Sequence, residues 1–100
     1  MIAEKVRVTD GEVPGHLLVV DDEALIRWAA SSTLSDAGYE VAQAADGAEA
    51  RRQSASKQFD LALLDLRLPD TDGLTLMRDI LTQQPQCPFI VMTAFRTPEL

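Results

Sequence analysis

The sequence predicts an α/β domain in which a doubly wound parallel sheet carries helices on both faces. Two observations support this prediction: short apolar runs of strand length, and helical patterns between them. The runs lie at residues 17–20, 61–64 and 89–92. Each is continuously apolar, which is typical of parallel strands buried on both faces. Because crossovers between parallel strands are right-handed, the alternation places helices on both sides of the sheet.

The first helix is predicted to follow the first strand directly. Apolar residues recur there at helical spacing, and Gly38 is the expected left-handed residue beyond the last turn. A short strand at residues 40–44 comes next. The predicted buried positions of this helix are Ile26, Ala29 or Ala30, Leu34 and Ala37.

The second and third helices are recognised by their ends. Asp46 is the expected N-cap of a helix that runs to about Ser56. The third helix opens near Gly73, and Pro85 and Pro88 lie beyond its end. Its core-facing stripe is predicted to consist of Leu76, Met77, Ile80 and Leu81.

Residues 1–15 precede the first predicted strand, and we expect them to form a flexible lead-in to a folded domain at residues 16–100. Val6 and Val8 alternate with charged residues, so the alternative for this segment is an additional edge strand.

The composition excludes several classes of function. The chain has 100 residues, and its 16 acidic and nine basic residues give a net charge of −7, which disfavours direct binding to nucleic acid or an anionic membrane. Cys87 has no second cysteine for a disulfide or a zinc site. No apolar run approaches the roughly 20 residues of a transmembrane helix, and no signal peptide is recognisable. We therefore expect a cytoplasmic protein.

Three carboxylates follow two of the predicted strands. Asp21 and Asp22 come directly after the first strand, and Asp65 comes directly after the third. Ligands of open parallel sheets bind beyond the carboxyl ends of the strands, where these side chains would meet if the strands are neighbours. Like charges in one site oppose folding without a cation, and Mg²⁺ prefers such oxygen ligands. The cluster predicts a Mg²⁺ site with room for a phosphoryl oxygen; the alternative is that Asp21 or Asp22 only caps the next helix.

Three motifs in this order resemble the receiver domain of two-component response regulators. They are LVVDDE at residues 18–23, LLDLRLPDTDG at 63–73 and IVMTA at 90–94, and the resemblance covers residues 16 to about 97. It implies a flavodoxin-like fold with strand order 2-1-3-4. Members of the family continue with a further helix, a fifth strand and a final helix, so the resemblance implies a receiver that lacks this last α-β-α part.

The resemblance also implies a role for each matching residue. Asp65 corresponds to the phosphoacceptor, whose carboxylate attacks phosphorus and forms an acyl phosphate. Asp21, Asp22 and Asp65 would hold Mg²⁺ with the backbone carbonyl of Arg67, Asp21 partly through water. Thr93 matches the hydroxyl that bonds the new phosphoryl group. The implied partner is a histidine kinase or phosphotransfer protein, and the implied function is a Mg²⁺-dependent self-phosphorylating switch rather than a turnover enzyme.

The sequence departs from the family pattern in two functional residues of the fifth strand, a lysine and an aromatic residue, since Phe95 lies too close to Thr93 to be the latter. A lysine on the family's fifth strand pairs with the phosphoryl group, and no lysine follows Lys57 here. Losing a cation from a preorganised site slows catalysis. The alternative function is therefore a receiver-like interaction scaffold that is not efficiently phosphorylated. The strand at 89–92 is also expected to be an uncovered apolar edge, so that the chain is either a fragment of a longer regulator or pairs with a second copy through this edge.

Two other classes of protein with a similar architecture agree less well with the sequence. A haloacid-dehalogenase-like phosphatase needs an aspartate two residues after its nucleophile, where this chain has Arg67. A flavodoxin-like electron carrier needs a hydroxyl- and glycine-rich loop after the first strand, where Asp21, Asp22 and Glu23 would repel its phosphate.

Several remaining residues have structural interpretations. Asp70 and Asp72 are interpreted as turn and N-cap residues. An EF-hand register is excluded because it places Leu68 at the first ligand position. His16 is interpreted as a structural or surface residue, and Trp28 as a packing residue or a partner-facing anchor.

Overall fold

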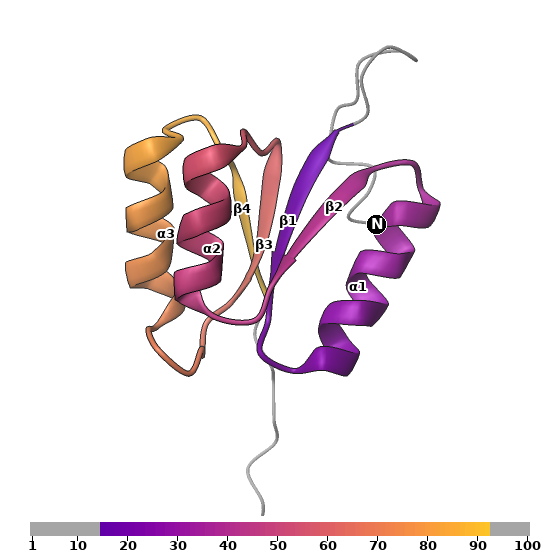
Figure 1. The fold of residues 1–100 in the computed structure, drawn as a ribbon, viewed down its shortest axis with the longest axis horizontal. Helices are drawn as coiled ribbons and strands as arrows, with labels where there is room; N and C mark the ends of the chain where they lie inside the picture. Colours follow the sequence, from indigo (N-terminus) through magenta and orange to yellow (C-terminus); the bar gives the residue numbers. More distant parts are fainter. Residues whose placement is uncertain (1–14, 93–100) are drawn as a thin grey trace, which may run out of the picture.

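The computed structural model describes residues 15–92. Residues 1–14 of the predicted lead-in at residues 1–15 and Thr93, the predicted partner of the phosphoryl group, lie outside them. The described residues alternate between strands and helices along the chain (Figure 1). The strands are β1 (His16–Val20), β2 (Glu40–Ala44), β3 (Leu61–Asp65) and β4 (Phe89–Met92), and the helices are α1 (Ala24–Asp36), α2 (Gly47–Ser56) and α3 (Gly73–Gln83).

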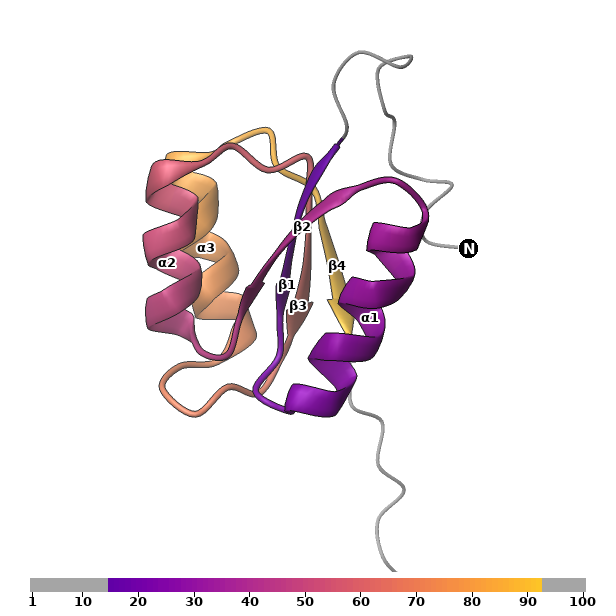
Figure 2. The same cartoon turned by 45° about the vertical axis from the view of Figure 1, so that its right-hand side comes forward.

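The four strands form one parallel sheet in the order β2-β1-β3-β4, which confirms the predicted fold class and strand order. Helix α1 packs on one face, over β1 and β2, while α2 and α3 lie side by side on the other (Figures 1 and 2). None of these helices is long and apolar enough to cross a membrane. The order makes β1 and β3 neighbours, so their carboxyl ends reach the same edge of the sheet.

Both faces of the central strands are buried, which explains their continuous apolar runs. The even-numbered apolar residues of β1 and β3 pack with Leu76 and Ile80 of α3. The odd-numbered apolar residues of both strands pack with Leu34 of α1 on the opposite face. Because successive side chains of a strand point to opposite faces, a strand between two helical layers has no position for an exposed polar residue.

The predicted ends of the helices are confirmed. Asp46 Oδ1 accepts a hydrogen bond of 2.8 Å from the Glu49 N–H at the start of α2. Asp72 Oδ1 accepts one of 2.8 Å from the Thr75 N–H at the start of α3. Gly38 has a φ of +102°, the left-handed conformation expected after α1.

The predicted buried face of α1 is only partly correct. Leu34 is buried and Ala30 packs against the core, but Ile26 is 42% exposed and Ala37 is also exposed. Trp28 is 62% exposed, so it does not pack into the core.

The orientation of α1 follows from a polar contact at its first turn. Arg27 Nη1 donates a hydrogen bond of 2.6 Å to the backbone carbonyl of Asp21. This bond turns Arg27 toward the end of β1, and the buried Ser31 and Leu34 follow on the same side of the helix at positions i+4 and i+7. Apolar spacing alone did not reveal this, because two of the residues on the inner face are polar.

Candidate functional site

The three predicted metal ligands meet at the carboxyl edge of the sheet. Val20 of β1 is in register with Leu64 of β3, so the residues that end or follow these strands lie next to each other. One carboxylate oxygen from each of Asp21, Asp22 and Asp65 lies within 4.8 Å of the others. Asp21 and Asp65 are buried, whereas Asp22 is exposed.

Asp21 is fixed by hydrogen bonds from both sides. Its Oδ1 accepts a 2.9 Å bond from the Glu23 N–H, and its own N–H donates to the Ala44 carbonyl of β2 at 3.1 Å. The N-cap residue of α1 is Glu23, and no side chain caps this helix. The alternative interpretation of Asp21 or Asp22 as a simple helix cap is therefore wrong.

The electrostatic environment of Asp21 is unfavourable to its ionised form. Burial raises the pKa of the Asp21 carboxyl, and the Glu23 N–H bond partly opposes this effect. The charges of Asp65, Asp22 and Glu23 raise the pKa further. A buried carboxylate among like charges is stabilised by a cation, and a hard divalent ion suits these oxygen ligands.

Asp65 lies at the last position of β3, where the chain folds into a tight loop. Its Oδ1 accepts a 3.1 Å hydrogen bond from the Arg67 N–H. Its other carboxylate oxygen has no hydrogen bond within the part of the chain that the structure describes. The Gly73 N–H donates to the Leu66 carbonyl at 2.7 Å, so the loop returns to its starting point. The role of the Arg67 carbonyl as a metal ligand stays a prediction.

The loop also makes a contact that sequence reasoning missed. Asp70 lies in the loop, but its carboxylate accepts hydrogen bonds from the Gly47 and Ala48 N–H groups at the start of α2. These residues are 23 and 22 positions away in the chain, so no local pattern could have indicated the contact.

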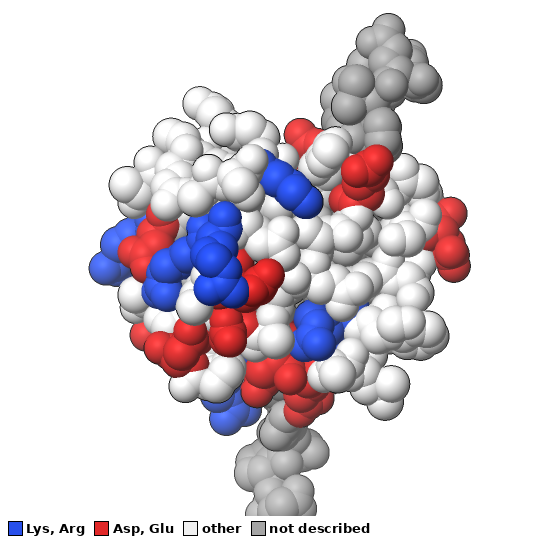
Figure 3. All heavy atoms as spheres, viewed as in Figure 1, with Lys and Arg blue, Asp and Glu red and all other residues white. Residues whose placement is uncertain are grey.

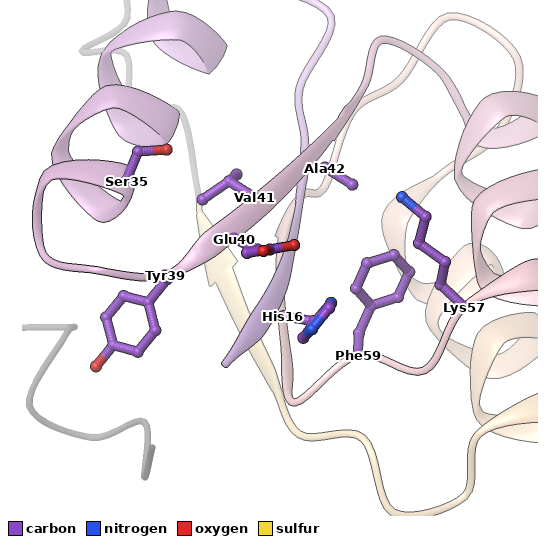
Figure 4. A pocket seen from close by; sticks show the side chains of 8 residues that line it. All are labelled: His16, Ser35, Tyr39, Glu40, Val41, Ala42, Lys57 and Phe59. Atoms are coloured by element: carbon purple, nitrogen blue, oxygen red, sulfur yellow. The ribbon is translucent and has the colours of Figure 1, made fainter. Parts of the chain in front are cut away.

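The opposite end of the sheet has a different chemistry. A pocket there is lined by His16, Glu40 and Lys57, among other residues (Figure 4). His16 is half-buried, and its backbone N–H donates to the Asp60 carboxylate at 2.8 Å; the structural or surface role of its side chain stays a prediction. Over residues 15–92, the only group of three or more potential metal ligands is the one formed by Asp21, Asp22 and Asp65.

Charged side chains are unevenly distributed over the surface of the molecule. Acidic side chains gather at the lower edge of the molecule in Figure 3, where β1 and β3 end, with a few basic ones beside them, and basic and acidic side chains are interspersed over α2 and α3. The edge that carries the three aspartates is thus rich in acidic side chains, which suits a site for a divalent cation.

Comparisons with known proteins agree with this geometry. The family model of the response regulator receiver domain matches residues 17–100. The DNA-binding transcriptional regulator NtrC of Escherichia coli is 41% identical over 80 residues, which are 80% of this chain and 17% of that protein. The chain spans less than half the length of the first regulators it matches.

Solved structures give the same result. A response regulator from Burkholderia pseudomallei, with a phosphorylated aspartic acid, calcium ion and citrate, has a TM-score of 0.77 and 27% identity over 84% of this chain and 49% of that chain. TrrA from Thermotoga maritima, in complex with Mg²⁺ and BeF, has a TM-score of 0.76 and is 34% identical in sequence. The similarity covers 81% of this chain and 70% of that chain. The chain therefore belongs to the family of response regulator receiver domains.

Proposed function

We propose that this chain accepts a phosphoryl group on the carboxylate of Asp65, in a Mg²⁺-dependent transfer from a phosphohistidine of a histidine kinase or phosphotransfer protein. A carboxylate oxygen of Asp65 forms a bond to phosphorus while the bond between phosphorus and the donor imidazole nitrogen breaks. The observation that carries this proposal is the convergence of Asp65 with Asp21 and Asp22 within 4.8 Å. The relatives with a phosphorylated aspartic acid or with Mg²⁺ and BeF support it.

The donor set is suitable for Mg²⁺. Opposite ligands of this ion lie about 4.2 Å apart, and the ion keeps several waters. We assign the carboxylates of Asp22 and Asp65 and the backbone carbonyl of Arg67 as direct ligands, and Asp21 as a ligand partly through water. When bound, Mg²⁺ supplies positive charge that neutralises the phosphoryl oxygens.

The residues around Asp65 orient the nucleophile. The Arg67 N–H holds Oδ1, which leaves the second oxygen for attack on phosphorus. We assign Thr93 to the hydroxyl that bonds the transferred group.

A phosphoryl group adds negative charge and strong acceptor oxygens, and this change favours a different arrangement of the nearby loops. That rearrangement would alter a partner-binding surface. A cytoplasmic location without direct nucleic-acid contact stays a prediction from composition.

The test is phosphorylation by a small phosphodonor. The chain is incubated with acetyl phosphate or phosphoramidate, with Mg²⁺ or with EDTA, and its intact mass is measured. We expect the wild-type chain to gain one phosphoryl group with Mg²⁺ only, and Asp65→Asn to gain none. Asp36→Asn, an exposed position at the end of α1, is the matched control and should behave like the wild type.

Two results would contradict the proposal. Covalent phosphate on Asp65→Asn would show that another residue is the acceptor. A folded wild-type chain that takes up no phosphate would favour the alternative function, an interaction scaffold that is not efficiently phosphorylated.

A further inference from the structure

The loop that follows Asp65 is bound to the first turn of α2. Asp70 Oδ1 accepts a 2.8 Å hydrogen bond from the Gly47 N–H, and Oδ2 accepts a 3.0 Å bond from the Ala48 N–H. The first N–H groups of a helix have no partner within the helix, and a negative charge is favoured there. These bonds lower the pKa of the Asp70 carboxyl, the Gly47 bond most of all. The carboxylate is therefore ionised when it holds the helix.

A close steric contact accompanies the hydrogen bonds. Gly47 is buried, and a Cβ at this position would lie 2.6 Å from Thr71 Cγ2 and 3.1 Å from Asp70 Oδ1. The absence of a side chain at Gly47 leaves room for the Thr71 and Asp70 side chains against the helix. Two independent features, the bonds and the glycine, thus hold residues 70 and 71 against α2.

The same loop carries the backbone that faces Asp65. The Arg67 N–H donates to Asp65 Oδ1, and the Leu68 N–H donates to the Thr71 carbonyl at 3.2 Å. A displacement of Asp70 and Thr71 would therefore be transmitted to Leu68 and to its neighbour Arg67. The first turn of α2 and the surroundings of Asp65 are connected by only a few residues.

We propose that Asp70 is a positioning residue for the Mg²⁺ site. By holding the loop at residues 66–72 against the N-terminus of α2, Asp70 fixes the Arg67 backbone beside Asp65. This inference rests on the proposed function, since it assumes that Mg²⁺ binds at Asp65. Coupling between two sites is reciprocal, so Mg²⁺ binding also stabilises the contact between Asp70 and α2.

The chain offers a matched control for the test. Asp46 caps the same helix, but it does so locally, through the Glu49 N–H, and has no hydrogen bond to the loop within residues 15–92. Asp46→Ala and Asp70→Ala each remove one carboxylate from the start of α2. Only the second substitution releases the loop.

The first measurement is Mg²⁺ affinity by calorimetric titration of each variant, with melting temperatures recorded in parallel. We expect Asp70→Ala to weaken Mg²⁺ binding about tenfold, the size typical of residues that orient metal ligands. Asp46→Ala should lower the melting temperature but keep the affinity within about twofold. Asp70→Asn should restore part of the affinity, because its amide oxygen can still accept the Gly47 N–H.

The second measurement follows the amides of Gly47 and Ala48 by NMR during the Mg²⁺ titration. We expect their hydrogen exchange to slow in the wild-type chain with the same midpoint as Mg²⁺ binding, and not in Asp70→Ala. Equal Mg²⁺ affinities of Asp70→Ala and Asp46→Ala would overturn the inference and leave the proposed function intact. A wild-type chain that binds no Mg²⁺ would overturn both.

Discussion

The ionised carboxylate of Asp21 suits the proposed Mg²⁺ site, but it destabilises the folded chain when no cation is bound. Its pKa is raised from 3.8 by burial and by the charges of its acidic neighbours. Between its ordinary pKa and the raised one, the folded state binds more protons than the unfolded state. The free energy of unfolding therefore falls as the pH rises through this interval. The loss persists at pH values above this interval.

Removing this charge should stabilise the chain in the absence of Mg²⁺. We expect Asp21→Asn to raise the free energy of unfolding at pH 7 by about 1 kcal/mol, typical of an optimised charge. The amide oxygen can keep the hydrogen bond from Glu23. Urea unfolding in EDTA at pH 4 and pH 7 measures the effect, and the gain should be larger at pH 7. The variant should gain less stability from added Mg²⁺ than the wild type does. A lower stability of Asp21→Asn than of the wild type at pH 7 would contradict this account.

At the scale of single elements, the start of α3 packs directly against the backbone of Asp65, the proposed phosphoacceptor. A Cβ on Gly73 would lie 2.7 Å from the Asp65 carbonyl oxygen and 2.8 Å from Leu66 Cα. Both are backbone atoms, which cannot move aside as a flexible side chain can. The glycine thus sets how closely α3 approaches the end of β3.

We expect Gly73→Ala to lower the free energy of unfolding by about 2 kcal/mol, as overpacking of a tight contact does. It should also weaken Mg²⁺ binding, because Asp65 or α3 must shift. Gly38→Ala is the control: its φ of +102° strains an alanine, but no atom lies within 4 Å of the new Cβ. This variant should lose stability and keep its Mg²⁺ affinity. If both variants bind Mg²⁺ equally well, the contact of α3 with Asp65 does not shape the site.

The elements also show what the sequence could and could not predict. The strands were recognisable because burial on both faces leaves continuous apolar runs, and Asp46, Asp72 and Gly38 marked helix ends through local chemistry. The carboxylate cluster was predictable because Asp21 and Asp65 follow strands that the resemblance made neighbours. The buried side of α1 was partly wrong because Arg27, a charged residue, turns inward to a backbone carbonyl. The contact of Asp70 with α2 depends on tertiary structure alone.

At the scale of the whole molecule, the two edge strands of the described sheet differ in polarity and in the helices that contact them. β2 begins with Glu40 and is contacted by α1 and α2. β4 is the edge strand on the other side, is apolar throughout, and exposes 37% of Val91. An apolar edge with unpaired backbone groups favours pairing with another chain. We therefore predict that this chain forms dimers through β4.

A charge on this edge should oppose the association. In a twofold dimer the same positions of both copies lie at the shared edge, so Val91→Lys brings two like charges together. We expect this variant to dimerise about tenfold more weakly, equivalent to about 1.4 kcal/mol. Leu25→Lys is the control, because Leu25 is 76% exposed and lies on α1, which packs against β2 and β1 on the other side of the sheet from β4. Sedimentation velocity over a range of concentrations measures both.

The register of β4 gives this prediction a functional consequence. Met92 of β4 pairs with Asp65 of β3, so the proposed dimer edge ends beside the proposed phosphoacceptor. A phosphoryl group on Asp65 would add negative charge beside one end of the shared edge in each copy, and we expect phosphorylation to weaken the dimer. The comparison is sedimentation of the wild type and of Asp65→Asn, each with Mg²⁺, before and after acetyl phosphate. A wild-type chain that is monomeric at every concentration would contradict the dimer itself. A dimer that persists unchanged after phosphorylation would contradict its link to Asp65.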